Sequence, residues 1–124
     1  MNIVGIVGRL VRDPELRTTS AGHAVTTFTV AVDRQFTDSD GNREADFVDC
    51  VAWRGAAEFV SKHFTKGKPI MVEGRLQTRT YEGKDGAKRK ATEVIAERVG
   101  FVPLPPRREA DAPPEDPPPG EGGW

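Results

Sequence analysis

The chain has 124 residues, of which 30% are charged and 36% are hydrophobic, and its formal net charge is −1. This length allows one domain with one core and excludes two domains of ordinary size. Cys50 is the only cysteine, which excludes an intramolecular disulfide and a thiolate metal cluster and favours a reducing compartment. The N-terminal apolar stretch is too short for a signal peptide or a membrane span, so we expect a soluble cytoplasmic protein without membrane contact.

The first segments of the chain predict a strand and a loop. Residues 2–10 are β-branched and apolar, and they are bounded by Asp13-Pro14, which favours a strand. Residues 12–24 are polar and rich in turn formers, so we expect a loop there. The loop and the strand before it contribute three cations, Arg9, Arg12 and Arg17.

A hairpin follows this loop. Residues 25–36 are dense in valine, threonine and phenylalanine, and apolar residues alternate along them, as in a long strand. Asp40-Gly41 is a short-range hairpin signal, and residues 46–54 return as a third strand. A calcium loop is the competing interpretation of this acidic turn, but the spacing of its glycine and of its last carboxylate favours the hairpin.

The second half of the chain predicts one helix and two strands. Residues 55–65 carry apolar or aromatic side chains at helical spacing, namely Ala56, Phe59, Val60, His63 and Phe64. Residues 68–81 predict a fourth strand, residues 82–86 a turn, and residues 88–102 a fifth strand. This order indicates an all-β, five-stranded OB-fold barrel with one helix between strands three and four, whereas an open five-stranded sheet is the competing architecture.

The sequence offers no recognisable catalytic or metal site. Gly67-Lys68 lacks the upstream glycine and the following hydroxyl residue of a phosphate-binding loop. His23 and His63 lie forty residues apart, and neither has a cysteine or carboxylate at ligand spacing. We therefore expect a protein that is not an enzyme and that uses no cofactor and no metal.

The aromatic residues divide into two groups by their neighbours. One group lies among apolar residues and is predicted to be core, and it consists of Phe28, Phe59, Phe64 and Phe101. The other group lies beside charged or polar residues, and it consists of Phe36, Phe47, Trp53 and Tyr81. Rings flanked by cations bind unpaired bases of any identity, because every base has a stackable face. The alternative for Phe36 and Phe47 is that they cap one end of the barrel.

Alternation along the third strand supports this division. Val48, Cys50 and Ala52 form one small, uniformly apolar side that suits a barrel core. Phe47 and Trp53 therefore point outward together. The matching basic candidates lie beside the rings and in the last predicted hairpin, which we expect to protrude and to follow a phosphate chain; they are Arg34, Arg54, Arg75, Arg79, Lys84, Lys88, Arg89 and Lys90.

The last segment, residues 103–124, differs in composition from the rest. It holds eight of the ten prolines and no valine, isoleucine, phenylalanine or methionine, so it has little apolar surface to offset the entropy of ordering. We expect a disordered acidic tail after a folded domain of residues 1–102. The domain has a formal charge of +2 and the tail one of −3, so stacking rather than overall charge must contribute much of any nucleic-acid affinity.

Over residues 1–102 the chain resembles the bacterial single-stranded DNA-binding proteins. Five blocks match in order and spacing: NIVGIVGRLVRDPELR, AVTTFTVAVDRQF, EADFVDCVAWRGAAEFVSKHFTKG, IMVEGRLQTRTYEGKDG and TEVIAERV. The resemblance implies an OB-fold homotetramer, associated with the nucleoid, that binds and protects single-stranded DNA in replication, recombination and repair. It also implies base stacking by Phe36, Phe47, Trp53 and Tyr81.

The tail departs from the pattern of that family. Replicative members end in a run of aspartates and a Pro-Phe tip that recruits replication and repair proteins, whereas this chain ends in PPEDPPPGEGGW. One hypothesis is that Trp124 with its α-carboxylate replaces the tip as the partner-binding group. The other is that the tail is degenerate, as in an accessory or phage-encoded paralogue, and the sparse acids favour this second hypothesis.

Two alternative functions remain at this point. OB-fold barrels also bind RNA, so an RNA-binding module is one alternative. A scaffold subunit that assembles replication and repair partners, with only incidental DNA contact, is the other.

Overall fold

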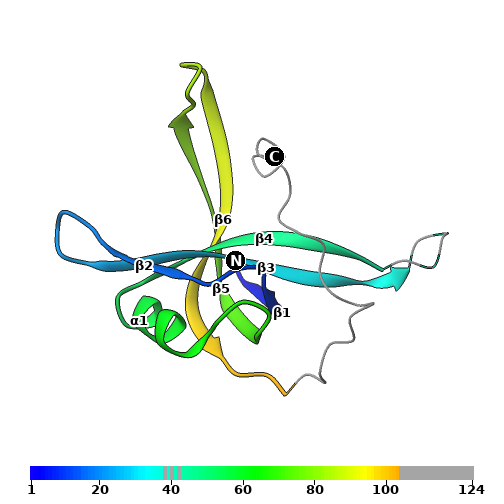
Figure 1. Cartoon of the computed structure of the whole chain (residues 1–124). Coiled ribbons are helices and arrows are strands. Elements are labelled where there is room, and N and C mark those ends of the chain that lie inside the picture. The colour runs from blue at the N-terminus through cyan, green and yellow to red at the C-terminus, as the bar shows by residue number, and fades with distance from the viewer. Residues whose placement is uncertain (38, 40, 42, 104–124) are drawn as a thin grey trace.

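The computed structural model in Figure 1 describes residues 1–37, 39, 41 and 43–103, and within these all side chains except those of 35–37 and 43. The elements in chain order are β1 (Val4–Leu10), β2 (Glu15–Thr18), β3 (Ala24–Thr37), β4 (Arg43–Trp53), α1 (Arg54–His63), β5 (Pro69–Glu82) and β6 (Lys88–Gly100). The predicted tail beyond Pro103 lies outside the described residues, and so does Trp124. No helix among the described residues is long and apolar enough to cross a membrane.

The strands form one sheet that returns on itself. Their order is β1-β5-β6-β4-β3-β2, and β1 also pairs with β3 through Arg9 and Leu10. The link between β4 and β6 is short and parallel, and it runs from Cys50 to Ala52 on β4. Because β1 joins β5 to β3, the strands close into a ring, and the predicted OB-fold rather than the open sheet is confirmed.

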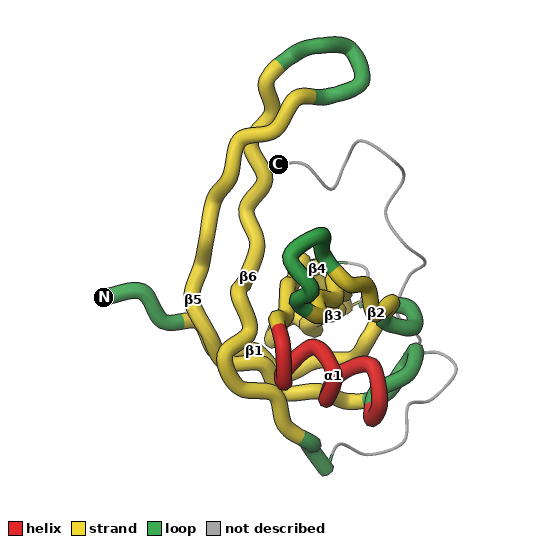
Figure 2. Tube along the Cα trace, turned by 90° about the vertical axis from the view of Figure 1, so that its left-hand side faces the viewer, coloured by secondary structure: helices red, strands yellow, loops and turns green. Residues whose placement is uncertain are grey.

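The core fills this ring and is covered at one end by α1, as Figure 2 shows. Helix α1 contributes Ala57 and Val60 to the core, and Phe64 follows directly after it. The strands contribute Leu10, Phe28, Val30, Cys50, Ala52, Ile70, Val72, Val94 and Ala96 to the same core cluster. Cys50 and Ala52 therefore lie inside, as alternation along β4 predicts.

Two hairpins extend away from this body (Figure 1). The β5–β6 arm, residues 77–93, continues both strands well beyond the ring, and the β3–β4 arm, residues 33–37 and 43–46, does the same in another direction. The predicted protruding hairpin is thus confirmed. β5 leaves the body at Gly74, where its pairing with β6 shifts register, and a Cβ atom at Gly74 would collide with the carbonyl oxygen of Ile95.

The predicted loop over residues 12–24 is wrong in part, because Glu15–Thr18 form β2. This strand pairs antiparallel with the start of β3, and the turn between them is closed by Thr19 and His23. The Thr26 hydroxyl donates to the Glu15 carbonyl oxygen at 2.7 Å. All four β2 residues are exposed, so the strand has no buried side that alternation could have revealed.

The prediction that Phe101 belongs to the core is also wrong. Phe101 follows the end of β6 and is 56% exposed, although its ring stacks on Phe64 with centroids 5.1 Å apart. The Lys68 ammonium lies 5.0 Å from the centre of the Phe101 ring on the same side of the molecule. Phe28 and Phe64 are buried as predicted, whereas Phe59 is only half-buried.

Candidate nucleic-acid interface

A cleft of about 360 Å³ lies between the outer face of the body and the β5–β6 arm. The body contributes one wall, which consists of Arg12, Thr27, Phe28, Thr29, Asp49 and Cys50. The arm contributes the other, which consists of Arg79, Tyr81, Ala91, Thr92 and Glu93. The cleft thus joins β3 and β4 to two strands that lie far from them in the sequence.

Tyr81 lies on the arm wall of the cleft and is 36% exposed. The guanidinium carbon of Arg79 lies 5.4 Å from the centre of the Tyr81 ring, a cation–π contact. Arg79 is itself oriented by Glu93, whose Oε1 accepts a hydrogen bond from Arg79 Nε at 2.7 Å. The side chain of Glu93 is only 11% exposed, so a half-exposed cation and a half-exposed ring are held together at the mouth of the cleft.

Trp53 and Phe47 lie on the outer side of β4, as their alternation with Cys50 and Ala52 predicts. Trp53 is 43% exposed at the end of the strand. Phe47 is half-buried and lines a smaller apolar pocket of about 150 Å³ together with Leu76. Six residue steps of extended strand place the Cα atoms of Phe47 and Trp53 about 20 Å apart, which is enough for several stacked bases between the two side chains.

Arg34 and Phe36 lie on the β3–β4 arm. The Phe36 side chain lies outside the described ones, so its stacking role stays a prediction. Arg34 Nη1 donates to Glu44 at 2.7 Å and Nη2 donates to Asp46 at 2.9 Å. These bonds, first the one with Asp46, raise the pKa of Arg34. The positive charge of Arg34 and the negative charges of Glu44 and Asp46 therefore add up to a local net charge of −1.

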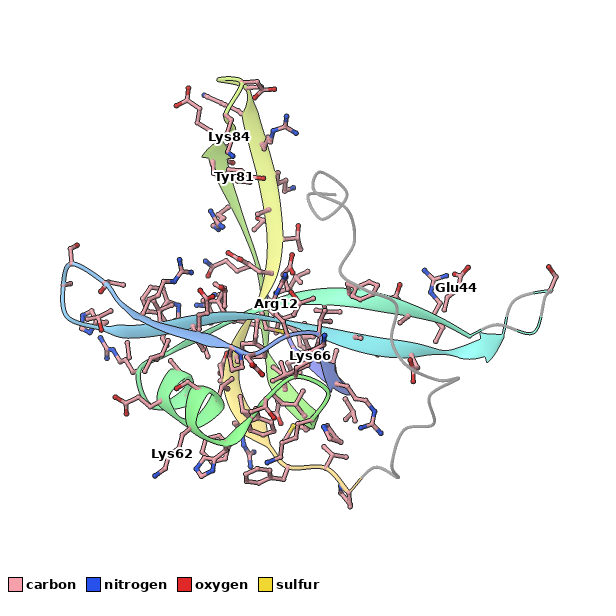
Figure 3. The ribbon with its side chains drawn as sticks, viewed as in Figure 1. Arg12, Glu44, Lys62, Lys66, Tyr81 and Lys84 are labelled. Carbon is pink, nitrogen blue, oxygen red and sulfur yellow. The ribbon has the colours of Figure 1, made fainter. Side chains whose placement is uncertain are left out.

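The other predicted cations are spread over three places. Arg54 is exposed at the start of α1, next to Trp53, and has a left-handed backbone with φ 55°. Arg75 lies 3.9 Å from Glu97 at the base of the β5–β6 arm, and Arg89 lies 3.0 Å from Asp85 near its end. The lysines Lys84, Lys88 and Lys90 are all exposed on the outer part of the arm, and Figure 3 shows Lys84 beyond Tyr81.

Arg12 and Arg17 are interface candidates that the sequence analysis did not select. Arg12 lines the cleft and donates to the Thr29 hydroxyl at 3.4 Å, and Arg17 donates to the Thr27 hydroxyl at the same distance. Figure 3 shows Arg12 where the arms meet the body. These two residues could have been predicted from the sequence, because both arginines lie in the first connecting segment of an OB-fold, and this segment commonly binds ligands.

Cys50 lies beneath the cleft and is buried. Burial, followed by the charges of Asp49 and Glu93, raises the pKa of its thiol to about 12. A thiol with this pKa is protonated at neutral pH and is a poor nucleophile or metal ligand. Within the described part of the chain, no three histidine, cysteine or acidic side chains gather in a group that could hold a metal ion.

The family model and the relatives that match this chain all belong to one kind of protein. The model of the single-strand binding protein family matches residues 1–102. "Single-stranded DNA-binding protein 2" of Listeria innocua is 53% identical over 111 residues, which cover 90% of this chain and 69% of that relative. Single-stranded DNA-binding proteins of Bacillus cereus and Bacillus subtilis are 55% and 54% identical over 102 residues, 82% of this chain. This chain covers 60% and 59% of those two relatives.

Proposed function

Because the chain belongs to the single-strand binding protein family, we propose that it binds single-stranded DNA through the cleft and the β5–β6 arm. Binding is without catalysis and without strong preference for sequence. The main support for this proposal is that Tyr81 and Arg79 on the arm face the threonine-lined outer surface of β3 across one cleft. Trp53 and Phe47 extend the same outer surface along β4.

Stacking and phosphate contact have separate locations in this proposal. Unpaired bases stack on Tyr81, Trp53, Phe47 and Phe36, and each stacked base contributes about 1–3 kcal/mol. Duplex DNA hides these base faces, so the rings favour single strands. The proposed phosphate contacts come from cations around the rings, namely Arg12, Arg17, Arg34, Arg54, Arg75, Arg79, Lys84, Lys88, Arg89 and Lys90.

Fluorescence titration with poly-dT tests the proposal. Trp124 is the only other tryptophan, so a Trp124→Phe background makes Trp53 the sole tryptophan reporter, and quenching of its emission is expected. Anisotropy of labelled DNA then measures the Trp53→Ala, Tyr81→Ala double variant, whose affinity should fall about 30-fold or more, as two lost stacks imply.

The matched control for this titration is Phe101→Ala. Phe101 is also an exposed ring beside a cation, but it lies next to α1 and not on the cleft. Its removal should leave DNA affinity unchanged. Equal affinity of the double variant and the wild type would overturn the stacking mechanism, and preference for RNA in competition with DNA of equal length would favour the RNA-binding alternative.

We also propose a homotetramer, since β1 presents an apolar outer side. Ile3, just before β1, is 70% exposed, and Val7 on the same side of the extended chain is 44% exposed. Exposed apolar residues along a strand with a partly open edge invite pairing with another subunit. Sedimentation should give a tetramer for the wild type and smaller species for the Ile3→Lys, Val7→Lys double variant.

The wider role that we propose is protection of single-stranded DNA during replication, recombination and repair in the cytoplasm, associated with the nucleoid. Residues 1–102 form the binding domain, and residues 103–124 form an acidic tail without DNA contact. If Trp124 anchors partner proteins, deleting residues 120–124 lowers affinity for replication and repair proteins. Unchanged affinity would leave the tail without this recruiting role.

A further inference from the structure

Four arginines of the proposed interface, Arg34, Arg75, Arg79 and Arg89, are already paired with carboxylates. Arg79 pairs with Glu93 at 2.7 Å, Arg89 with Asp85 at 3.0 Å and Arg75 with Glu97 at 3.9 Å. Arg34 pairs with both Glu44 and Asp46. All four arginine side chains remain about half exposed, so they are accessible to DNA but are not free charges.

The lysines of the same arm differ from these arginines. Among the described residues, Lys84, Lys88 and Lys90 make no ion pair, and all three are exposed. The arm therefore carries two kinds of cation, arginines paired with a carboxylate and lysines that make no ion pair with the described residues.

This difference determines which cations release salt ions when DNA binds. A lysine that neutralises a phosphate frees the cation condensed on the strand, and log K falls with log salt by about 0.7 per such contact on single strands. A phosphate that approaches a paired arginine meets a net charge of zero. The strand then keeps its cation, or the displaced carboxylate takes one up, so the net release is near zero.

We propose that Glu93, Asp85, Glu97, Glu44 and Asp46 are built-in counterions of the DNA interface, which keep the four arginines that they pair with from adding to the salt dependence of binding. This inference rests on the proposed function, because it concerns the same surface. The carboxylates lower affinity at low salt and preserve it at high salt. Stacking on Tyr81 and its partners then contributes a larger share of the binding free energy than the number of cations suggests.

The test is the slope of log K against log salt for poly-dT with full-length variants. Lys84→Gln with Lys88→Gln should lower the slope by about 1.4, the sum of two contacts. Arg79→Gln should weaken binding with little change in slope. Glu93→Gln should steepen the slope by about 0.7, because Arg79 without its carboxylate can neutralise a phosphate and free the cation condensed there.

Two further variants keep the result interpretable. Asp85→Asn should steepen the slope as Glu93→Gln does, and it removes a half-exposed carboxylate without disturbing a buried group. Glu58→Gln on α1 removes an exposed carboxylate away from the cleft and should not change the slope. Loss of slope in Arg79→Gln equal to that of one lysine, or unchanged slopes in both carboxylate variants, would overturn the proposal. Absence of wild-type binding would instead overturn the proposed function.

Discussion

Strand β5 belongs to two regions of the molecule that are stabilised in different ways. In the body, Ile70 and Val72 are fully buried between β1 and the core. In the β5–β6 arm, Thr78–Glu82 are exposed, and among the described strands they pair only with β6. One strand therefore has a part that holds the core and a part that carries the proposed DNA contacts. Substitutions in the body should change stability, and substitutions in the arm should change DNA affinity.

The largest expected effect is in the body. Phe64→Ala removes a ring that is 1% exposed and packs within the core, and a Phe→Ala change of this kind costs about 3–5 kcal/mol. Urea unfolding measures the loss, and DNA binding by the fraction that stays folded should be normal. A drop in affinity of the folded protein would show that the body and the arm are coupled.

The next effect is in the arm. Tyr81→Ala should weaken binding of poly-dT by about 1–3 kcal/mol, because one stacking surface is lost. The free energy of unfolding should change by less than about 0.5 kcal/mol, as for exposed positions in general. Thr80→Ala, the neighbouring exposed position, should affect neither quantity, and a large loss of stability in Tyr81→Ala would contradict the separation.

Cys50 tests the boundary between the two regions, because it is a core residue beneath the cleft. Its pKa is raised from 9.0 to about 12, so the folded state keeps a proton that the unfolded state loses. The stabilisation is therefore present below pH 9 and is lost as pH rises towards 12. At pH 10 the loss is about 1 kcal/mol, measurable by urea unfolding against Cys50→Ala. Thiol reagents should react rapidly only with unfolded protein, and rapid reaction under native conditions would contradict burial of Cys50.

The smallest effect is expected at the Arg89–Asp85 pair near the end of the arm. Both side chains are about half exposed, and ion pairs of this kind contribute about 0–1 kcal/mol. Arg89→Gln should therefore leave the urea midpoint almost unchanged. A large shift in the midpoint would mean that the end of the arm contributes to folding after all.

The fold could be predicted from the sequence wherever buried and exposed residues alternate regularly along an element. The inward side of β4 follows from alternation, and so does the outward direction of Phe47 and Trp53. Strand β2 has no buried side, and Phe101 has apolar neighbours but lies on the surface. In both cases the deciding contact comes from another element, which local composition does not report.

The interface was predictable in its residue types but not in its pairing. The rings and cations of the arm follow from composition, yet the partner of Arg79 is Glu93, fourteen residues away on the opposite strand. That pairing depends on the strand register, which shifts by one residue between Glu73 and Gly74 of β5. The positions of the charges were therefore predictable from the sequence, whereas the pairing of four arginines with carboxylates was not.

Gly74 lies where the body and the β5–β6 arm meet. A Cβ atom at this position would collide with the carbonyl oxygen of Ile95, so β5 and β6 can approach each other this closely only with a glycine here. We expect a larger residue at position 74 to push the two strands apart and to change the width of the cleft. Because no DNA contact is proposed for Gly74, such a substitution adjusts DNA affinity while every side chain of the proposed interface is kept.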